Sequence, residues 1–282
     1  MNFQEIASNL QYTSGIWYSR EKNTISYPES GNQNSFQIEE DSPWFQHRNS
    51  CIAALVKKFS PNETIFDIGG GNGIVSIGLE REGINTVLVE PGEAGILNAQ
   101  KRNLKNLICS TLNDAAFMPD SIPSIGLFDV LEHVEDDHAF LKNLNNLLVP
   151  NGKIYISVPA YSFLWSNEDD LGGHYRRYTL DLLEKKLKQT GFRLLYKTYI
   201  FCVLPIPIFL MRSVPSRLGL AKNSIVVSDQ KQVHSSISIL NKVHQWELRR
   251  IQKWKTIPFG GSCLLAAHKI SEKSETPFPA FS

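Results

Sequence analysis

Cysteine is scarce in this sequence, and the few that occur lie far apart. The 282 residues include four cysteines, Cys51, Cys109, Cys202 and Cys263. Zinc-binding and redox motifs need two cysteines within a few positions of each other, and no such pair exists here. We therefore predict no metal site, and we interpret all four side chains as free thiols of a protein in the reducing cytoplasm.

Long apolar runs are also absent. The longest apolar stretch, Tyr199 to Met211, contains Pro205 and Pro207 and is too short to cross a bilayer as a helix. The N-terminus lacks the basic start and apolar core of a signal peptide. A hydrophobic content of 42% and a charged content of 20% are those of an ordinary globular protein, so we predict a soluble cytoplasmic protein.

Neither sign of charge is in excess. The chain has 29 lysines and arginines against 28 aspartates and glutamates, which gives a formal net charge of +1. Proteins that bind nucleic acid as an obligate partner are usually basic, so we expect no nucleic-acid partner.

The sequence does contain a regular alternation of short apolar segments with amphipathic ones. After a polar N-terminal arm, residues 1–42, one domain is predicted over residues 43–269, followed by a loose tail, 270–282. The apolar segments predict seven buried strands, at residues 64–68, 86–90, 107–109, 125–128, 153–158, 192–198 and 262–267. Helical periodicity between them predicts an α/β fold in which helices cover both faces of a mostly parallel sheet.

A long insertion, roughly residues 200–258, separates the last two predicted strands, and we interpret it as a lid on the substrate side. A helix over about residues 237–254 places Glu247 in the middle of an apolar stripe. A buried carboxylate is costly unless it is paired. We therefore expect either a salt bridge to an arginine of residues 174–178 or an acid that faces the substrate under the lid.

The most informative segment is the glycine-rich turn after the first predicted strand, Asp67 to Gly73, which reads Asp-Ile-Gly-Gly-Gly-Asn-Gly. Glycines there let the backbone approach a ligand closely between a strand and a helix N-terminus. No register of the turn fits the dinucleotide fingerprint G-x-G-x-x-G. Asp67 can instead face a cationic amino-acid group, and Glu90, which ends the next strand, can accept hydrogen bonds from ribose hydroxyls. A tight turn with unrelated acids is the less favoured alternative.

This turn and Glu90 resemble the first motif and the second acid of the class I S-adenosylmethionine (SAM) dependent methyltransferases. Residues 128–134, Phe-Asp-Val-Leu-Glu-His-Val, resemble the fourth-strand motif of the branch that contains ubiquinone-biosynthesis O-methyltransferases and methyltransferases of polysaccharide gene clusters. The similarity covers about residues 43–200 and the last strand. It implies a Rossmann-like seven-stranded sheet with the last strand antiparallel, and SAM over the carboxyl ends of the first strands.

The resemblance also implies which residues contact SAM. Phe128 matches the position whose backbone meets the methionine amino group. Arg48 either reaches the methionine carboxylate or has a surface role. Adenine recognition leaves two registers open, with the backbone of Leu112 or the side chain of Asp114 as the contact. The implied SAM contacts are Asp67, Gly69, Gly70, Gly71, Gly73, Glu90, Leu112, Asp114, Phe128 and Arg48.

The segment after the fifth predicted strand, residues 159–178, is the predicted substrate side because ligands gather at the carboxyl ends of parallel strands. It is rich in aromatic and polar residues and follows no periodicity, which is typical of a site rather than a core. His174 is the preferred general base because imidazole titrates near neutrality. The alternative is that His174 only pins the following helix, and His133 competes for the role of base.

The predicted substrate contacts are aromatic or charged side chains. Arg176 and Arg177 either hold an anionic group of the substrate or pair with an acid of residues 168–170. The full set is Tyr161, Tyr175, Arg176, Arg177, Tyr178 and, from the insertion, Glu247.

The function predicted from these residues is methyl transfer from SAM to a small-molecule acceptor, at a hydroxyl of a sugar, a quinone-like compound or a lipid-linked substrate. A catalytically silent methyltransferase-like domain that binds a ligand or a partner is one alternative. A nicotinamide-dependent oxidoreductase is another, and the glycine register disfavours it.

The apolar residues 201–211 need burial somewhere. We favour packing on the lid helix and on the edge of the sheet. The alternative is an exposed patch that rests on a membrane surface, with Arg212 and Arg217 close to anionic headgroups. Pro205 and Pro207 disfavour a regular helix through this stretch.

Overall fold

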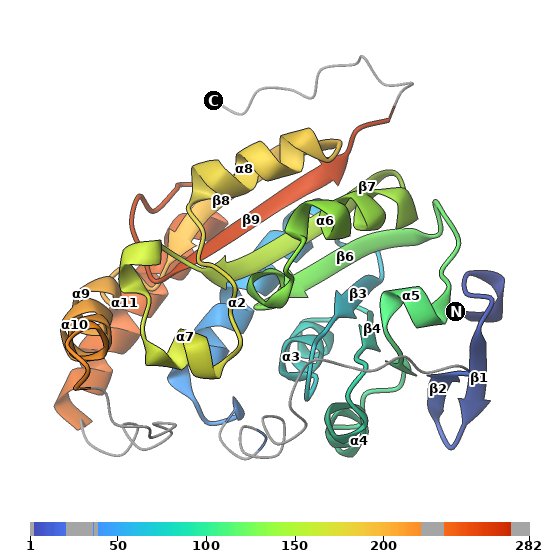
Figure 1. The fold of residues 1–282 in the computed structure, drawn as a ribbon, viewed down its shortest axis with the longest axis horizontal. Helices are drawn as coiled ribbons and strands as arrows, with labels where there is room; N and C mark the ends of the chain where they lie inside the picture. Colours follow the sequence, from blue (N-terminus) through green and yellow to red (C-terminus); the bar gives the residue numbers. More distant parts are fainter. Residues whose placement is uncertain (1–2, 21–35, 37–38, 221–233, 272–282) are drawn as a thin grey trace.

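The computed structural model describes residues 3–20, 36, 39–220 and 234–271, and the side chains of 234–239 are not part of this description. Within these residues nine strands form one sheet in the order β1-β2-β5-β4-β3-β6-β7-β9-β8 (Figure 1). The strands are β1 (Leu10–Thr13), β2 (Ile16–Ser19), β3 (Ile65–Ile68), β4 (Thr86–Val89), β5 (Leu107–Cys109), β6 (Ile122–Phe128), β7 (Leu148–Pro159), β8 (Phe192–Ile200) and β9 (Ser262–Lys269).

The centre of the sheet follows the prediction. Strands β5, β4, β3, β6 and β7 pair in parallel, and β9 runs antiparallel to both β7 and β8. All residues of β3 and β4 are buried, and all but Asp67 and Thr86 are apolar, because helices cover both faces of the sheet.

The predicted count of seven strands is wrong, because the N-terminal arm adds a hairpin to the sheet edge. Strand β2 pairs with β1 antiparallel and with β5 in parallel. Ser14 and Gly15 join β1 to β2 with φ values of 51° and 89°. A two-residue turn with positive φ at both positions matches the twist of a hairpin. Leu10 of β1 and Ile16 of β2 are buried, as are Phe3 and Ala7 before the hairpin, so a few apolar side chains hold this mostly polar segment on the protein.

Helices occupy the two faces of the sheet. Leu144 and Leu183 pack with β6 and β7 on one face, whereas Ile52, Val75 and Ile251 pack on the other. The α-helices are α2 (Pro43–Phe59), α3 (Ile74–Arg81), α4 (Glu93–Lys101), α5 (Leu112–Ala115), α6 (Asp137–Leu147), α7 (Asn167–Leu171), α8 (Leu180–Gln189), α9 (Pro205–Ile208), α10 (Val214–Arg217) and α11 (His234–Gln252). Shorter turns are η1 (Phe3–Glu5), η2 (Leu131–His133), η3 (Ser162–Leu164) and the π-helical η4 (Phe209–Ser213).

The insertion between β8 and β9 is helical where it is described. Segments α9, η4 and α10 follow one another without a break from residue 205 to residue 217, but the middle segment is π-helical, so the stretch is helical without being one regular α-helix. Both prolines fall in the first turn, where backbone N–H groups have no partner inside the helix. Among the described residues, no helix is both long and apolar enough to cross a membrane.

Candidate active site

The glycine turn joins β3 to α3 and encloses a buried acid. Asp67 is fully buried, and its Oδ2 accepts a hydrogen bond of 2.7 Å from the Ser76 hydroxyl. Its Oδ1 has no hydrogen-bond partner among the described residues. Burial raises the pKa of Asp67 to about 6, although the Ser76 hydrogen bond and the charge of Arg48 act in the opposite direction. One carboxylate oxygen is therefore available to a further donor.

The shape of the turn depends on glycine. Gly69, Gly71 and Gly73 have φ values of 69°, 54° and 73°, in the left-handed region that other residues adopt at a cost. At Gly70 a Cβ would lie 2.6 Å from Oδ2 of Asp67, so there is no room for a side chain. The turn therefore presents bare backbone at the carboxyl end of β3.

Glu90 follows β4 and joins this turn, as the sequence predicts. Its Oε2 accepts a hydrogen bond of 2.9 Å from the Gly71 N–H, and its Oε1 accepts one of 2.8 Å from the Gly92 N–H. Burial raises the pKa of Glu90 to about 7, and the two backbone hydrogen bonds offset only part of this effect. Two acids with raised pKa values thus meet at one glycine turn.

Arg48 of α2 is near enough to Asp67 for its charge to act on that carboxylate. It is 4% exposed, so the alternative of a surface role is wrong. Its guanidinium pairs with Asp129, the residue after β6, and lies over the rings of Trp44 and Phe45 at 4.7 and 5.0 Å. Asp129 has a φ of 58°, which directs the chain into η2.

The two competing histidines are neighbours. The rings of His133 and His174 lie 4.7 Å apart in an edge-to-face arrangement. Possible ligand atoms of Glu132, His133 and His174 all lie within 4.8 Å of one another, a grouping of donor types that could hold a metal ion and that the sequence did not predict. Burial and the nearby His174 lower the pKa of His133. Burial and the charge of Asp129 raise the pKa of Glu132.

A buried carboxylate orients His174. Its Nδ1 lies 2.8 Å from Oδ1 of Asp169, which is 1% exposed. Asp169 also accepts hydrogen bonds of 2.7 and 3.0 Å from Arg177. Burial would raise the pKa of Asp169, but the bonds from His174 and Arg177 outweigh it and hold the pKa below its usual value. Because His174 uses Nδ1 for this bond, Nε2 is the atom available for proton transfer.

The basic residues of the loop anchor it to the protein. The pairing of Arg177 with Asp169 confirms one of the two roles predicted for it. Arg176 donates to the carbonyls of Val134 and Glu135 and pairs with Asp137. Because these contacts occupy both guanidinium groups, we do not retain Arg176 and Arg177 as acceptor contacts.

The tyrosines of the loop differ in exposure. Tyr178 is fully buried and donates to Oδ2 of Asp137 at 2.8 Å, so the prediction that it contacts the acceptor is corrected. Tyr175 is 52% exposed. Tyr161 is half-buried, and its ring packs against those of Phe163 and Tyr199 at 5.2 and 5.0 Å. Tyr161 and Tyr175 therefore remain accessible to an acceptor.

Glu247 is also part of the interior. It is fully buried, and it accepts hydrogen bonds from the backbone N–H groups of Phe201 and Cys202, at 2.9 and 2.5 Å. Its side-chain partner is the imidazole of His47 at 2.6 Å, so the expected pairing with an arginine of residues 174–178 is wrong. These contacts join α11 to α2 and to the end of β8, and they leave no surface for a substrate.

The remaining predicted cofactor residues lie at the same end of the sheet. Phe128 ends β6 and is buried. Leu112 and Asp114 lie on α5, where the Thr111 hydroxyl accepts a hydrogen bond from the Asp114 N–H at 3.0 Å. Both are 8% exposed, so burial does not discriminate between the two adenine registers.

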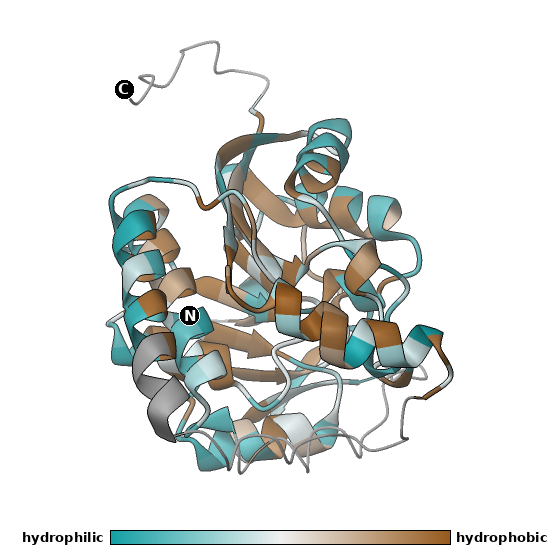
Figure 2. Cartoon of the chain, turned by 90° about the vertical axis from the view of Figure 1, so that its left-hand side faces the viewer, coloured by the Kyte–Doolittle hydropathy of each residue, from teal (hydrophilic) through white to brown (hydrophobic). Residues whose placement is uncertain are grey.

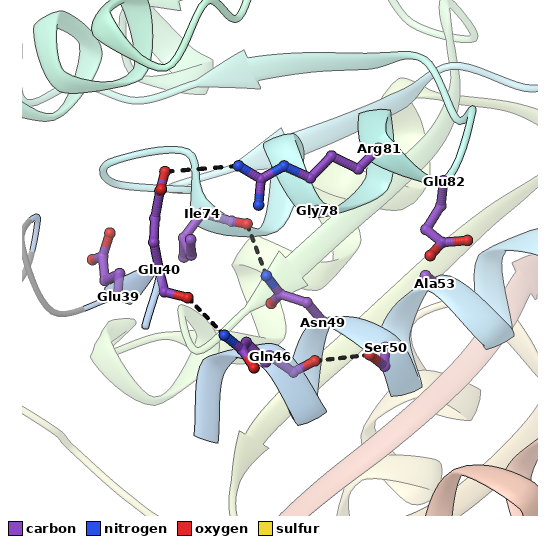
Figure 3. A pocket seen from close by; sticks show the side chains of 10 residues that line it. All are labelled: Glu39, Glu40, Gln46, Asn49, Ser50, Ala53, Ile74, Gly78, Arg81 and Glu82. Atoms are coloured by element: carbon purple, nitrogen blue, oxygen red, sulfur yellow. Dashed lines mark hydrogen bonds and ion pairs between the residues drawn. The ribbon is translucent and has the colours of Figure 1, made fainter. Parts of the chain in front are cut away.

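A polar pocket of about 180 Å³ lies next to this region, between α2 and α3 (Figure 3). Its lining side chains bond to their surroundings: Asn49 donates to the Ile74 carbonyl at 2.8 Å, and Arg81 lies 3.9 Å from Glu40. Asp67 and Glu90 do not line it. This pocket is therefore separate from the glycine turn.

Comparisons with known proteins agree on one family. A sequence model described as "Methyltransferase domain" matches residues 44–197. The ubiquinone biosynthesis O-methyltransferase of Pseudomonas paraeruginosa is 25% identical over 102 residues, which are 34% of this chain and 44% of that protein. The mitochondrial enzyme of the same name from Schizosaccharomyces pombe is 27% identical over 138 residues, 46% of this chain and 47% of that protein. The chain thus spans less than half the length of these relatives.

A solved structure with a similar fold is phosphoethanolamine N-methyltransferase 2 of Haemonchus contortus in complex with SAM. The TM-score is 0.55 at 19% sequence identity, over 88% of this chain and 58% of that chain. At this identity the likeness shows a common fold.

Proposed function

We propose, from the premise that the chain belongs to the family of SAM-dependent methyltransferases, that it methylates a hydroxyl group of a small-molecule acceptor. One observation carries the proposal. A buried carboxylate holds a histidine, Asp169 with His174, and a short path of contacts leads from it to the glycine turn with its two buried acids. The ring of His174 lies 4.7 Å from that of His133, and Val130, three residues before His133, packs against Gly69 of the turn. Arg48 pairs with Asp129 between these two places, and its charge offsets part of the rise that burial causes in the pKa of Asp67 and of Glu132.

The residues of the turn fit SAM. The unpartnered Oδ1 of Asp67 is a buried acceptor, and such an atom is costly until it meets a donor or a cation. Glu90 retains lone pairs on both carboxylate oxygens for ribose hydroxyls, in addition to the two backbone bonds. The bare backbone between Gly69 and Gly73 allows close approach. When bound, SAM supplies a methyl group on a positively charged sulfur.

The histidine supplies the base that a hydroxyl acceptor needs. As the acceptor oxygen gains the methyl group, Nε2 of His174 takes the hydroxyl proton. Asp169 holds the ring through Nδ1 and stabilises the imidazolium that results. Tyr161 and Tyr175 offer aromatic surface for the acceptor, which we propose to be a sugar, a quinone-like compound or a lipid-linked molecule.

The test is methyl transfer from isotopically labelled SAM to a panel of sugar, phenolic and lipid-linked alcohols. We expect label in at least one product, at oxygen. Tight SAM binding without transfer to any class would support a silent binding domain instead. Binding of NAD without binding of SAM would contradict the proposal outright.

The raised pKa values predict how SAM affinity depends on pH. In the free protein Glu90 and Asp67 have pKa values of about 7 and about 6. A cationic ligand favours the ionised carboxylates, so their pKa values fall on binding and protons are released. Affinity should therefore decrease as pH falls through these values, by about tenfold or more between pH 8 and pH 5.5.

Calorimetry over this pH range measures the effect directly. The Glu90→Gln variant removes the group with the higher pKa, so its affinity should start to fall at a lower pH. An affinity that stays constant over the range in the unmodified protein would contradict the assignment of these acids to the cofactor.

A further inference from the structure

The helical segment after β8 presents apolar side chains to solvent. Ile206, Leu210 and Met211 are 65%, 59% and 70% exposed. Val203 before the segment and Leu218 after it are also exposed apolar residues, at 42% and 65%. Figure 2 shows this segment as a mostly hydrophobic helix across the face of the molecule that it displays. We call these five side chains the apolar face.

The prediction that residues 201–211 pack on the protein is therefore correct for only one side of the segment. The inner side of the segment does pack on the protein: Pro205 and Ser213 are buried, and Ile208 lies near Gly261. The outer side carries the apolar face. Contiguous exposed apolar surface is uncommon on monomeric proteins and marks an interaction site.

Positive charge borders the apolar face. Arg217 donates to the Phe163 carbonyl at 2.7 Å, and its guanidinium lies 5.7 Å from the Phe209 ring. No carboxylate among the described residues pairs with it. Arg212 pairs with Glu168 at 2.6 Å, with both side chains about 40% exposed. An apolar helix face with arginine at its edge suits an anionic lipid surface, where hydrocarbon and headgroup phosphate lie side by side.

An apolar pocket is lined partly by this segment and partly by two aromatic residues that pack on Tyr161 of the proposed acceptor site. It has a volume of about 180 Å³ and is lined by Phe163, Pro205, Ile206, Phe209, Leu210 and Phe259. An apolar cavity of about 150 Å³ in another protein holds a benzene molecule, so this pocket has room for a short length of hydrocarbon. Phe163 and Phe259 each pack on Tyr161, with ring centroids 5.2 Å apart.

We propose that the apolar face docks on the surface of an anionic bilayer and that the pocket takes hydrocarbon from a lipid-linked acceptor. The choice of acceptor rests on the proposed function, whereas docking does not. A single helix face of this kind lies in the headgroup region and enters the bilayer only to shallow depth. Docking would bring Tyr161 and its loop to the membrane, so that an acceptor could reach the histidines without leaving the lipid phase.

The test is flotation of the full chain with vesicles of phosphatidylcholine, with and without phosphatidylglycerol. We expect binding to the anionic vesicles, reduced by high salt. The Ile206→Asp and Met211→Asp variants should each lose about tenfold or more of the vesicle affinity, since each places a charge where an apolar side chain enters lipid. Leu182→Asp is the matched control, because Leu182 is an exposed leucine of α8, 39% exposed, outside the apolar face.

Two further measurements keep the outcomes distinct. SAM affinity and thermal unfolding should be unchanged in all three variants, so a loss of flotation cannot arise from misfolding. Absence of flotation at low salt overturns the proposal. So does a dimer that dissociates in Met211→Asp without any vesicle binding, because the occupant would then be a second copy. If flotation holds and no alcohol is methylated, docking stands and the proposed function fails.

Discussion

The His174→Ala variant should turn over its acceptor about a hundredfold or more slowly, with unchanged affinity for SAM. The expectation follows from the position of the ring. Asp169 holds Nδ1 at 2.8 Å, which leaves Nε2 to accept a proton, and the hydrogen bonds of Asp67 and Glu90 at the proposed SAM site do not involve this ring. Loss of the imidazole removes the base without altering Asp67 or Glu90.

Control variants distinguish a catalytic base at His174 from a histidine that only stabilises the loop. His138→Ala changes an exposed histidine of α6 and should leave turnover intact. Asp169→Asn keeps the size of the side chain but removes the charge that stabilises the imidazolium, so turnover should fall there too, by about tenfold or more. Turnover of His174→Ala equal to that of the unmodified protein would make the histidine structural.

Features that depend on neighbouring residues could be predicted from the sequence. The glycine turn is one, because a strand, positive-φ glycines and a helix follow one another within a few positions. The meeting of Asp67 and Glu90 is another, because two adjacent parallel strands end at the same edge. The antiparallel last strand came instead from the resemblance to a family.

Side-chain pairs between residues distant in sequence could not be predicted, because the type of a residue does not reveal which helix or strand will pack against it. Glu247 illustrates this: its position in an apolar stripe correctly indicates that it needs a partner, but His47 lies 200 residues away. The pairing of Arg48 with Asp129 across 81 residues has the same character. Each depends on how α2 packs against the sheet.

The sequence also could not show which way the side chains of a loop point. The loop of residues 174–178 has the composition of a binding loop, yet Arg176, Arg177 and Tyr178 all turn toward the protein. Composition predicts that such a loop lies at the site, whereas burial decides which of its side chains face a ligand. The N-terminal hairpin was missed for a related reason, since only two of its residues, Leu10 and Ile16, are fully buried apolar side chains.

Replacing Gly71 by valine should weaken SAM binding by about a hundredfold or more, close to 2.7 kcal/mol. Gly71 has a φ of 54°, and its N–H donates to Glu90 at the centre of the turn. A branched side chain there would occupy the space through which we propose that the cofactor approaches the backbone, and it would also strain the left-handed conformation. Affinity is measured by calorimetry, and thermal unfolding reports the cost of the strain.

A second glycine with positive φ provides a control for the backbone strain that valine causes at Gly71. Gly83 has a φ of 80°, and a Cβ built there meets no heavy atom within 4 Å. Gly83→Val therefore carries the backbone penalty without a clash, at the turn after α3 rather than at the ligand. Both variants should lose a similar amount of stability, but only Gly71→Val should lose SAM affinity. If the two variants bind SAM equally well, the turn is a structural connection, and the acids beside it need another explanation.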